Sequence, residues 1–176
     1  MLTTFKSFFP YNQELIAEYP LMNDGEVQKR IDKASAGFSS WKNKSFAQRA
    51  DILIKVARLM RRDHEKLATL ISREMGKVLS ESRAEIEKCA WVCDYYAEKG
   101  AGFLKDEKRE AGYARSFISY QPIGAVLAIM PWNFPFWQVF RFAAPALMAG
   151  NTGLLKHAPN GCGCSGCGSR RRICPQ

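Results

Sequence analysis

The chain has 176 residues, a net charge of +9 and 24% charged residues, which is an ordinary composition for a folded soluble protein. The N-terminal segment lacks the long apolar run and cleavage site of a secretory signal, and no apolar stretch is long enough to span a membrane. Apart from Arg170-Arg171-Arg172, lysine and arginine are dispersed among acidic residues, which argues against a dedicated nucleic-acid binder. We therefore expect a cytoplasmic protein with no nucleic-acid or membrane partner.

Amphipathic patterns predict three helices in the first part of the chain. Apolar residues recur at helical spacing over residues 25–41, after Ser45 and after Asp63. Ser45 and Gln48 form a capping-box pattern for the second helix, and Asp63 is a suitable N-cap for the third. Gly76 is a suitable residue to end the third helix.

A fourth helix is predicted over residues 80–99, with Ile86, Ala90 and Cys93 on its inner face. Cys89 and Cys93 lie four residues apart in this pattern, and we interpret both as small apolar core residues. Because all four segments show a plain amphipathic period, we interpret these helices as structural packing layers.

After Gly100 the pattern changes to strands. Residues 114–120 combine aromatic and β-branched side chains and predict a strand. Residues 125–130 form a short apolar run, typical of a strand covered on both faces in a parallel sheet. An apolar helix over 136–149 and a second short strand over 152–156 then complete a predicted βαβ unit.

Two polar residues of this unit are candidates for a site. Asn133 is a suitable N-cap for the helix, with Pro135 in its first turn, and its amide can also donate to a developing oxyanion. Lys156 ends the second strand and can bind ribose hydroxyls or a phosphate. Because ligands bind beyond the carboxyl ends of parallel strands, both side chains are expected on a common rim. The plainer interpretations are a helix cap for Asn133 and a solvated lysine for Lys156.

Several short motifs resemble the aldehyde dehydrogenase superfamily. They are Pro122-Ile123-Gly124, Met130-Pro131-Trp132-Asn133-Phe134-Pro135, Gly150-Asn151-Thr152, Leu155-Lys156 and Glu74-Met75-Gly76-Lys77. Two further segments are similar to the succinate-semialdehyde dehydrogenase branch, namely Trp137-Gln138 and Lys156-His157-Ala158-Pro159-Asn160. The resemblance extends from roughly Phe8 to Asn160.

The resemblance implies an α/β fold with N-terminal helices and an incomplete Rossmann-like cofactor-binding domain, whose N-terminal part spans residues 1–160. It implies NAD(P)-dependent oxidation of a small-molecule aldehyde, succinate semialdehyde, to the carboxylate. Asn133 would be the catalytic oxyanion amide. Met130, Pro131 and Trp132 would line the nicotinamide-ribose side of the cleft, and Lys156 would bind the adenine ribose. The full-length family members are expected to form homo-oligomers.

One departure from the family pattern concerns the choice between NAD and NADP. NAD-specific members often place a glutamate three residues after the lysine, where this chain has Pro159. Without that carboxylate a 2′-phosphate is not repelled, and Lys156 and His157 would favour it. From the sequence we therefore hypothesise that the enzyme uses NADP.

In this family a cysteine thiolate attacks the aldehyde, hydride passes to the nicotinamide, and a glutamate assists hydrolysis of the thioester. The motifs that carry that cysteine and that glutamate do not occur in this sequence. We therefore expect a truncated N-terminal part of a dehydrogenase that is inactive alone. The alternative is a non-catalytic fragment or an oligomerisation module.

Residues 161–176 have a Cys- and Arg-rich composition unlike the rest of the chain, and we expect them to be disordered or translated out of frame. The alternative for this tail is a metal site built from cysteines. The candidate ligands are Cys162, Cys164, Cys167 and Cys174, with His157 as an additional candidate. Because their spacing lacks the paired C-x2-C arrangement of zinc sites, we expect no metal.

Overall fold

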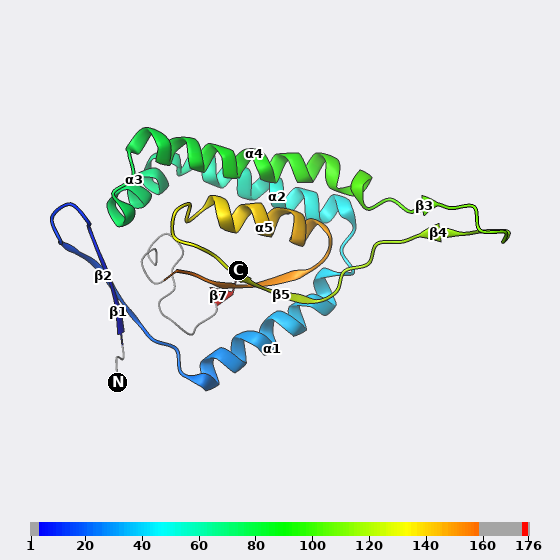
Figure 1. Ribbon diagram of the computed structural model, residues 1–176, viewed down its shortest axis with the longest axis horizontal. Coiled ribbons are helices and arrows are strands. Elements are labelled where there is room, and N and C mark those ends of the chain that lie inside the picture. The colour runs from blue at the N-terminus through cyan, green and yellow to red at the C-terminus, as the bar shows by residue number, and fades with distance from the viewer. Residues whose placement is uncertain (1–3, 159–173, 176) are drawn as a thin grey trace.

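The computed structural model describes residues 4–158 and 174–175. The helices are α1 (Asp24–Trp41), α2 (Phe46–Arg62), α3 (His64–Met75), α4 (Leu79–Phe103) and α5 (Trp137–Met148). The strands are β1 (Thr4–Phe8), β2 (Leu15–Pro20), β3 (Glu107–Lys108), β4 (Phe117–Ile118), β5 (Ala125–Ile129), β6 (Thr152–Lys156) and β7 (Cys174–Pro175). Figure 1 shows α2, α3 and α4 as one layer, α5 beneath it, then the sheet of β5, β6 and β7, with α1 on the opposite face.

Some helix boundaries follow from local sequence signals. Ser45 and Gln48 form the complete capping box predicted for α2. Gly76 ends α3 in the left-handed conformation, with φ of 67°. The predicted capping role of Asp63 is wrong, because its side chain makes no bond to the start of α3 and instead forms an ion pair with Arg62.

The main hydrophobic core lies where α2, α3, α4 and α5 pack together. Its fully buried members include Ala57, Ile71, Ile86, Cys89, Cys93 and Met148. The inner face predicted for α4 is therefore confirmed, and both cysteines pack in this core.

The predicted βαβ unit is also confirmed. β5 and β6 pair in parallel, from Ala125 opposite Thr152 to Ile129 opposite Lys156. α5 connects the two strands and packs against β6, while α1 packs against the other face of β6. This arrangement brings the carboxyl ends of β5 and β6 to one edge of the sheet.

One face of β5 is open to solvent. Leu127 and Ile129 are 51% and 66% exposed, whereas Ala128 between them is buried. The expected cover on both faces is therefore wrong for β5 within the described part of the chain. The physical reason is that α1 lies mainly over β6, and no described strand pairs with the second edge of β5.

Two antiparallel hairpins extend from the helical layers (Figure 1). The hairpin β1–β2 is attached to the end of α3, because the Ser7 hydroxyl donates to the Glu74 carboxylate at 2.7 Å. The hairpin β3–β4 projects away from the helices. The strand expected over residues 114–120 is limited to Phe117–Ile118, because no described layer covers these side chains and both remain exposed.

No helix within residues 4–158 is long and apolar enough to cross a membrane. Of the tail 161–176, only Cys174 and Pro175 are described, and their backbone pairs antiparallel with β6. The expected disorder of the tail and the alternative cysteine metal site otherwise lie outside the described residues. Within the described ranges no group of three or more His, Cys, Asp or Glu side chains is placed to hold a metal ion.

Candidate functional site

The rim at the carboxyl ends of β5 and β6 is the first part of the site. The backbone N–H of Met130 donates to the Lys156 carbonyl at 3.0 Å, which extends the pairing of the two strands by one residue. The loop that carries Asn133 leaves the sheet at this point. Met130 and Lys156 therefore start from the same edge of the sheet.

Asn133 does not cap α5. The helix begins at Trp137, four residues later, and its N-cap residue Phe136 offers no side-chain cap. The carboxylate of Glu85 on α4 takes that role, because Oε1 accepts hydrogen bonds from the backbone N–H groups of Phe136 at 2.9 Å and Trp137 at 3.0 Å. The predicted N-cap role of Asn133 is therefore wrong, and its side chain is exposed. Pro135 likewise precedes the helix instead of occupying its first turn.

Asn133 lines a pocket of about 510 Å³ between α4 and the start of α5. The other lining residues are Lys77, Glu81, Ala84, Glu85, Lys88, Phe134, Trp137, Gln138 and Arg141. Met130, Pro131, Trp132 and Lys156 do not line it. The predicted site residues thus divide into a pocket residue, Asn133, and a group at or next to the sheet rim.

Three cations and two carboxylates surround this pocket, and the cations differ in what they contact. Lys77 is paired with Glu85. The Lys88 ammonium lies over the Trp137 ring, 4.1 Å from its centroid. Arg141 is exposed and makes no hydrogen bond or ion pair with any residue in the described part of the chain. Its guanidinium contacts no other charged or aromatic group in the described part of the chain and is available to a ligand.

Sequence reasoning missed Glu85 and Arg141. The signal for Arg141 was present, since it is the one charged residue in the apolar segment 136–149 and lies one helical turn after Trp137. Residues one turn apart on a helix share a face, which places Arg141 beside Trp137 in the pocket wall. No local pattern links Glu85 to a helix that begins 52 residues later.

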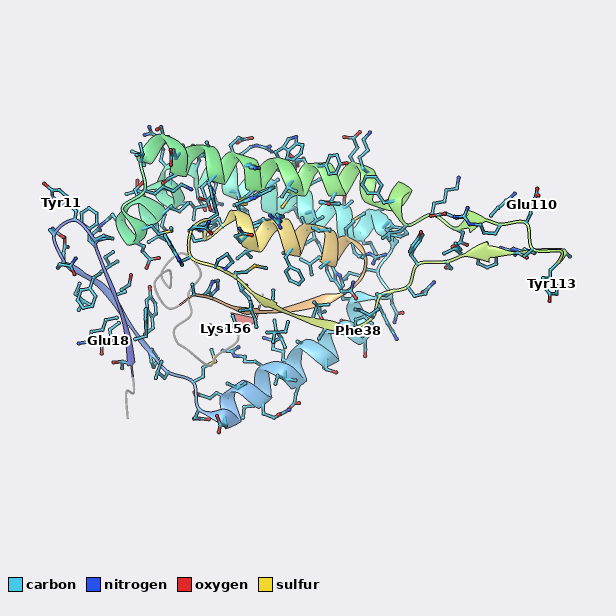
Figure 2. The ribbon with its side chains drawn as sticks, viewed as in Figure 1. Tyr11, Glu18, Phe38, Glu110, Tyr113 and Lys156 are labelled. Carbon is cyan, nitrogen blue, oxygen red and sulfur yellow. The ribbon has the colours of Figure 1, made fainter. Side chains whose placement is uncertain are left out.

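Lys156 is half-buried at the end of β6, where Figure 2 shows it between the α5 layer and α1. Its ammonium donates to the His157 carbonyl at 2.9 Å. The imidazole of His157 is buried, and this burial, with the neighbouring Lys156 charge, lowers the pKa of His157 to about 4. A neutral, buried imidazole carries no charge that would attract a phosphate, which argues against the expectation that His157 helps to select NADP.

The two described thiols in the helical core are not nucleophile candidates. Burial raises the pKa of Cys89 well above its usual range and that of Cys93 to about 12. Thiolates are the reactive form of cysteine, and neither side chain reaches solvent. Both therefore serve packing, as the sequence predicted.

Comparison with known proteins decides the family. Residues 2–165 match the sequence profile of the aldehyde dehydrogenase family. The chain belongs to the aldehyde dehydrogenase family. The predicted α/β fold class is confirmed as well, since the structure of a succinic semialdehyde dehydrogenase from Streptococcus pyogenes in complex with NADP+ superposes with a TM-score of 0.87 at 31% identity. That match covers 92% of this chain and 36% of the Streptococcus chain.

Relatives of this aldehyde dehydrogenase chain include succinate-semialdehyde dehydrogenases. A probable succinate-semialdehyde dehydrogenase [NADP(+)] from Synechocystis is 52% identical over 135 residues, which are 77% of this chain and 30% of the relative. The succinate semialdehyde dehydrogenase [NAD(P)+] Sad from Escherichia coli is 42% identical over 159 residues, which are 90% of this chain and 34% of the relative. The chain thus spans about a third of the length of the relatives that it matches.

Proposed function

We propose that this chain is the N-terminal part of an NAD(P)-dependent dehydrogenase that oxidises succinate semialdehyde to the dicarboxylate. Residues 1–160 would supply the start of the cofactor-binding domain and part of the substrate pocket. The names of the Synechocystis and Escherichia coli relatives support this substrate and an NADP or NAD cofactor.

One observation carries the proposal: Asn133 and Arg141 line the same pocket. An aldehyde oxygen becomes negatively charged when a nucleophile adds to the carbonyl, and an amide N–H stabilises that charge. A guanidinium binds a carboxylate through two parallel hydrogen bonds. Asn133 would hold the aldehyde end of succinate semialdehyde, and Arg141 would hold its carboxylate end.

The cofactor would bind at the neighbouring rim of the sheet. Met130, Pro131 and Trp132 lead away from the end of β5, and Lys156 ends β6 beside them. Lys156 would bind the adenine ribose and, in NADP, would favour the 2′-phosphate without help from His157. NAD(P) accepts a hydride from the substrate when bound. The residues of this chain would orient the two reactants on either side of the loop that carries Asn133.

Covalent catalysis also requires an accessible thiolate and a glutamate for thioester hydrolysis. Cys89 and Cys93 are too deeply buried for the first role. The family motifs that carry the catalytic cysteine and glutamate do not occur in the sequence. We therefore propose that the chain alone does not turn over aldehyde, and that catalysis needs the part of the family fold that this chain does not match.

The test uses a chimera in which residues 4–158 of this chain replace the matching segment of the Escherichia coli relative. Kinetics are compared for succinate semialdehyde and for butanal, which has the same carbon number without the carboxylate. Arg141→Met is expected to raise KM for succinate semialdehyde and leave butanal oxidation unchanged. Asn133→Ala is expected to lower kcat about 100-fold for both substrates. An Arg141→Met variant that loses both substrates equally would contradict the proposed carboxylate site.

A second proposal is a role in oligomerisation, and the exposed hairpin β3–β4 supports it. Figure 2 shows Glu110 and Tyr113 at the tip of this arm, far from the helical layers. Tyr113 is 83% exposed and Phe117 is 44% exposed. Exposed aromatic side chains on an uncovered strand pair are typical of subunit contacts. Sedimentation of the chimera with Tyr113→Ser and Phe117→Ser tests this, and an unchanged mass would contradict it.

A further inference from the structure

We infer that Lys77 and Glu85 are positioning residues that fix the loop carrying Asn133, and this inference rests on the oxyanion role proposed above for Asn133. The Lys77 ammonium and Oε2 of Glu85 lie 2.5 Å apart. Their side chains are only 10% and 1% exposed, so the ion pair is shielded from solvent. Both residues line the pocket that contains Asn133.

Glu85 holds the segment that follows Asn133 through its backbone. While Oε2 faces Lys77, Oε1 accepts from the N–H groups of Phe136 and Trp137. These groups start α5, whose N-terminus carries partial positive charge and has no cap of its own. A carboxylate from α4 therefore sets where α5 begins.

Lys77 holds the same segment through a side chain. Its ammonium lies over the ring of Phe134, 3.9 Å from the centroid, which is a cation–π contact. Phe134 is the residue next to Asn133. The pair thus contacts the chain at Phe134 on one side of Pro135 and at Phe136 on the other.

Asn133 itself makes no hydrogen bond with any residue in the described part of the chain. Lys77 and Glu85 therefore hold the backbone that carries this amide, and with it the position from which the side chain extends. A buried ion pair adds little net stability, because the loss of hydration of both charges offsets their attraction. The geometry points instead to a device that keeps a catalytic amide at a fixed distance from the reacting carbonyl.

The first test measures amide hydrogen exchange in this chain and needs no catalysis. Lys77→Met leaves the Glu85 carboxylate without its cation, and Glu85→Gln leaves the Lys77 ammonium without its anion. In either single variant, exchange of the Phe136 and Trp137 amides is expected to accelerate about tenfold or more. In the double variant the carbonyl oxygen of the new amide side chain is free to face those backbone N–H groups, and most of the protection should return. Unchanged exchange in the single variants, or a double variant no better than either, would overturn the inference.

Glu81→Gln is the matched control for this test. Glu81 lines the same pocket one turn earlier on α4, and it makes no hydrogen bond or ion pair with the described residues. The amide exchange rates of the Glu81→Gln variant should equal those of the parent chain. Exchange of the α2 amides reports whether each variant is folded. The double variant carries no charge at either position of the pair. If a single variant unfolds, the exchange rates of the Phe136 and Trp137 amides in the double variant decide whether the pair holds the loop.

The second test measures kinetics in the chimera described above. Lys77→Met and Glu85→Gln are expected to lower kcat for succinate semialdehyde about tenfold to a hundredfold. This loss is no larger than the loss in kcat caused by removing an oxyanion donor. KM for NADP should stay within about twofold, because the cofactor rim is untouched. If Asn133→Ala lowers kcat and the pair variants do not, the inference is overturned and the proposed function stands. If Asn133→Ala has no effect, the proposed function fails, and amide exchange still decides whether the pair fixes the loop.

Discussion

Arg49 on α2 lies against Gly150, which follows α5, and Nη1 of its guanidinium is 2.3 Å from the place where a Cβ on Gly150 would stand. Gly150 has φ of 95°, a conformation that other residues rarely adopt. Arg49 is buried, stacks on the Phe46 ring at 4.6 Å, and its Nε has no hydrogen-bond partner within the described residues. Glycine is therefore required at position 150 for two reasons, its backbone conformation and the space that Arg49 fills.

Gly150→Ala is expected to lower the free energy of unfolding by about 1–3 kcal/mol, through backbone strain and displacement of Arg49. Urea denaturation followed by circular dichroism measures this change. Gly37→Ala is the control, because Gly37 lies in α1 and a Cβ there meets nothing within 4 Å. That substitution should leave stability unchanged or raise it by about 0.5–1 kcal/mol. Equal effects of the two substitutions would contradict the account of Gly150.

Asn151 joins the starts of the two parallel strands. Its Oδ1 accepts from the backbone N–H groups of Ile123 at 2.8 Å and Gly124 at 3.2 Å, just before β5. Two lost hydrogen bonds predict a destabilisation of about 1–3 kcal/mol for Asn151→Ala. Asn151→Asp keeps the accepting oxygen and should remain near the parent. Thermal denaturation of both variants checks this, and a loss as large in the Asp variant would show that the oxygen is not what matters.

The sequence predicted features whose causes lie within a few residues. The capping box of Ser45 and Gln48 is confirmed because both partners lie within one helical turn. Gly76 ends α3 because a left-handed residue is needed there. The strand over 152–156 is found with the predicted bounds.

The features that the sequence did not predict depend on distant partners. Asn133 matched the local rule for an N-cap, but α5 is capped by Glu85 from α4, and no local rule includes a residue so far away. The strand expected over 114–120 had suitable residue types, yet strand length is set by a covering layer that the described arm lacks. The division of the site into a pocket with Asn133 and a rim with Lys156 likewise required the fold.

Cys89 and Cys93 are expected to resist alkylation in the folded chain. With the pKa of Cys93 raised to about 12, roughly one thiol in ten thousand is ionised at pH 8. Iodoacetamide labelling with peptide mapping should modify both residues only at urea concentrations that unfold the chain. Labelling of either cysteine in the folded state would contradict the burial seen here and reopen its assignment as a packing residue.

His157 is expected to make the chain less stable in mild acid. Its folded pKa of about 4 lies below the ordinary value of 6.5, so folding disfavours the protonated imidazole. The corresponding stability is fully present above pH 6.5 and is lost as pH falls toward 4, by about 2 kcal/mol when partial solvent screening is allowed for. Urea unfolding at several pH values should show this loss, and His157→Gln should flatten the dependence of stability on pH.

The chain has two histidines, and His64→Gln should preserve the loss. If removal of His64 flattens the profile and removal of His157 does not, the buried imidazole is not the titrating group.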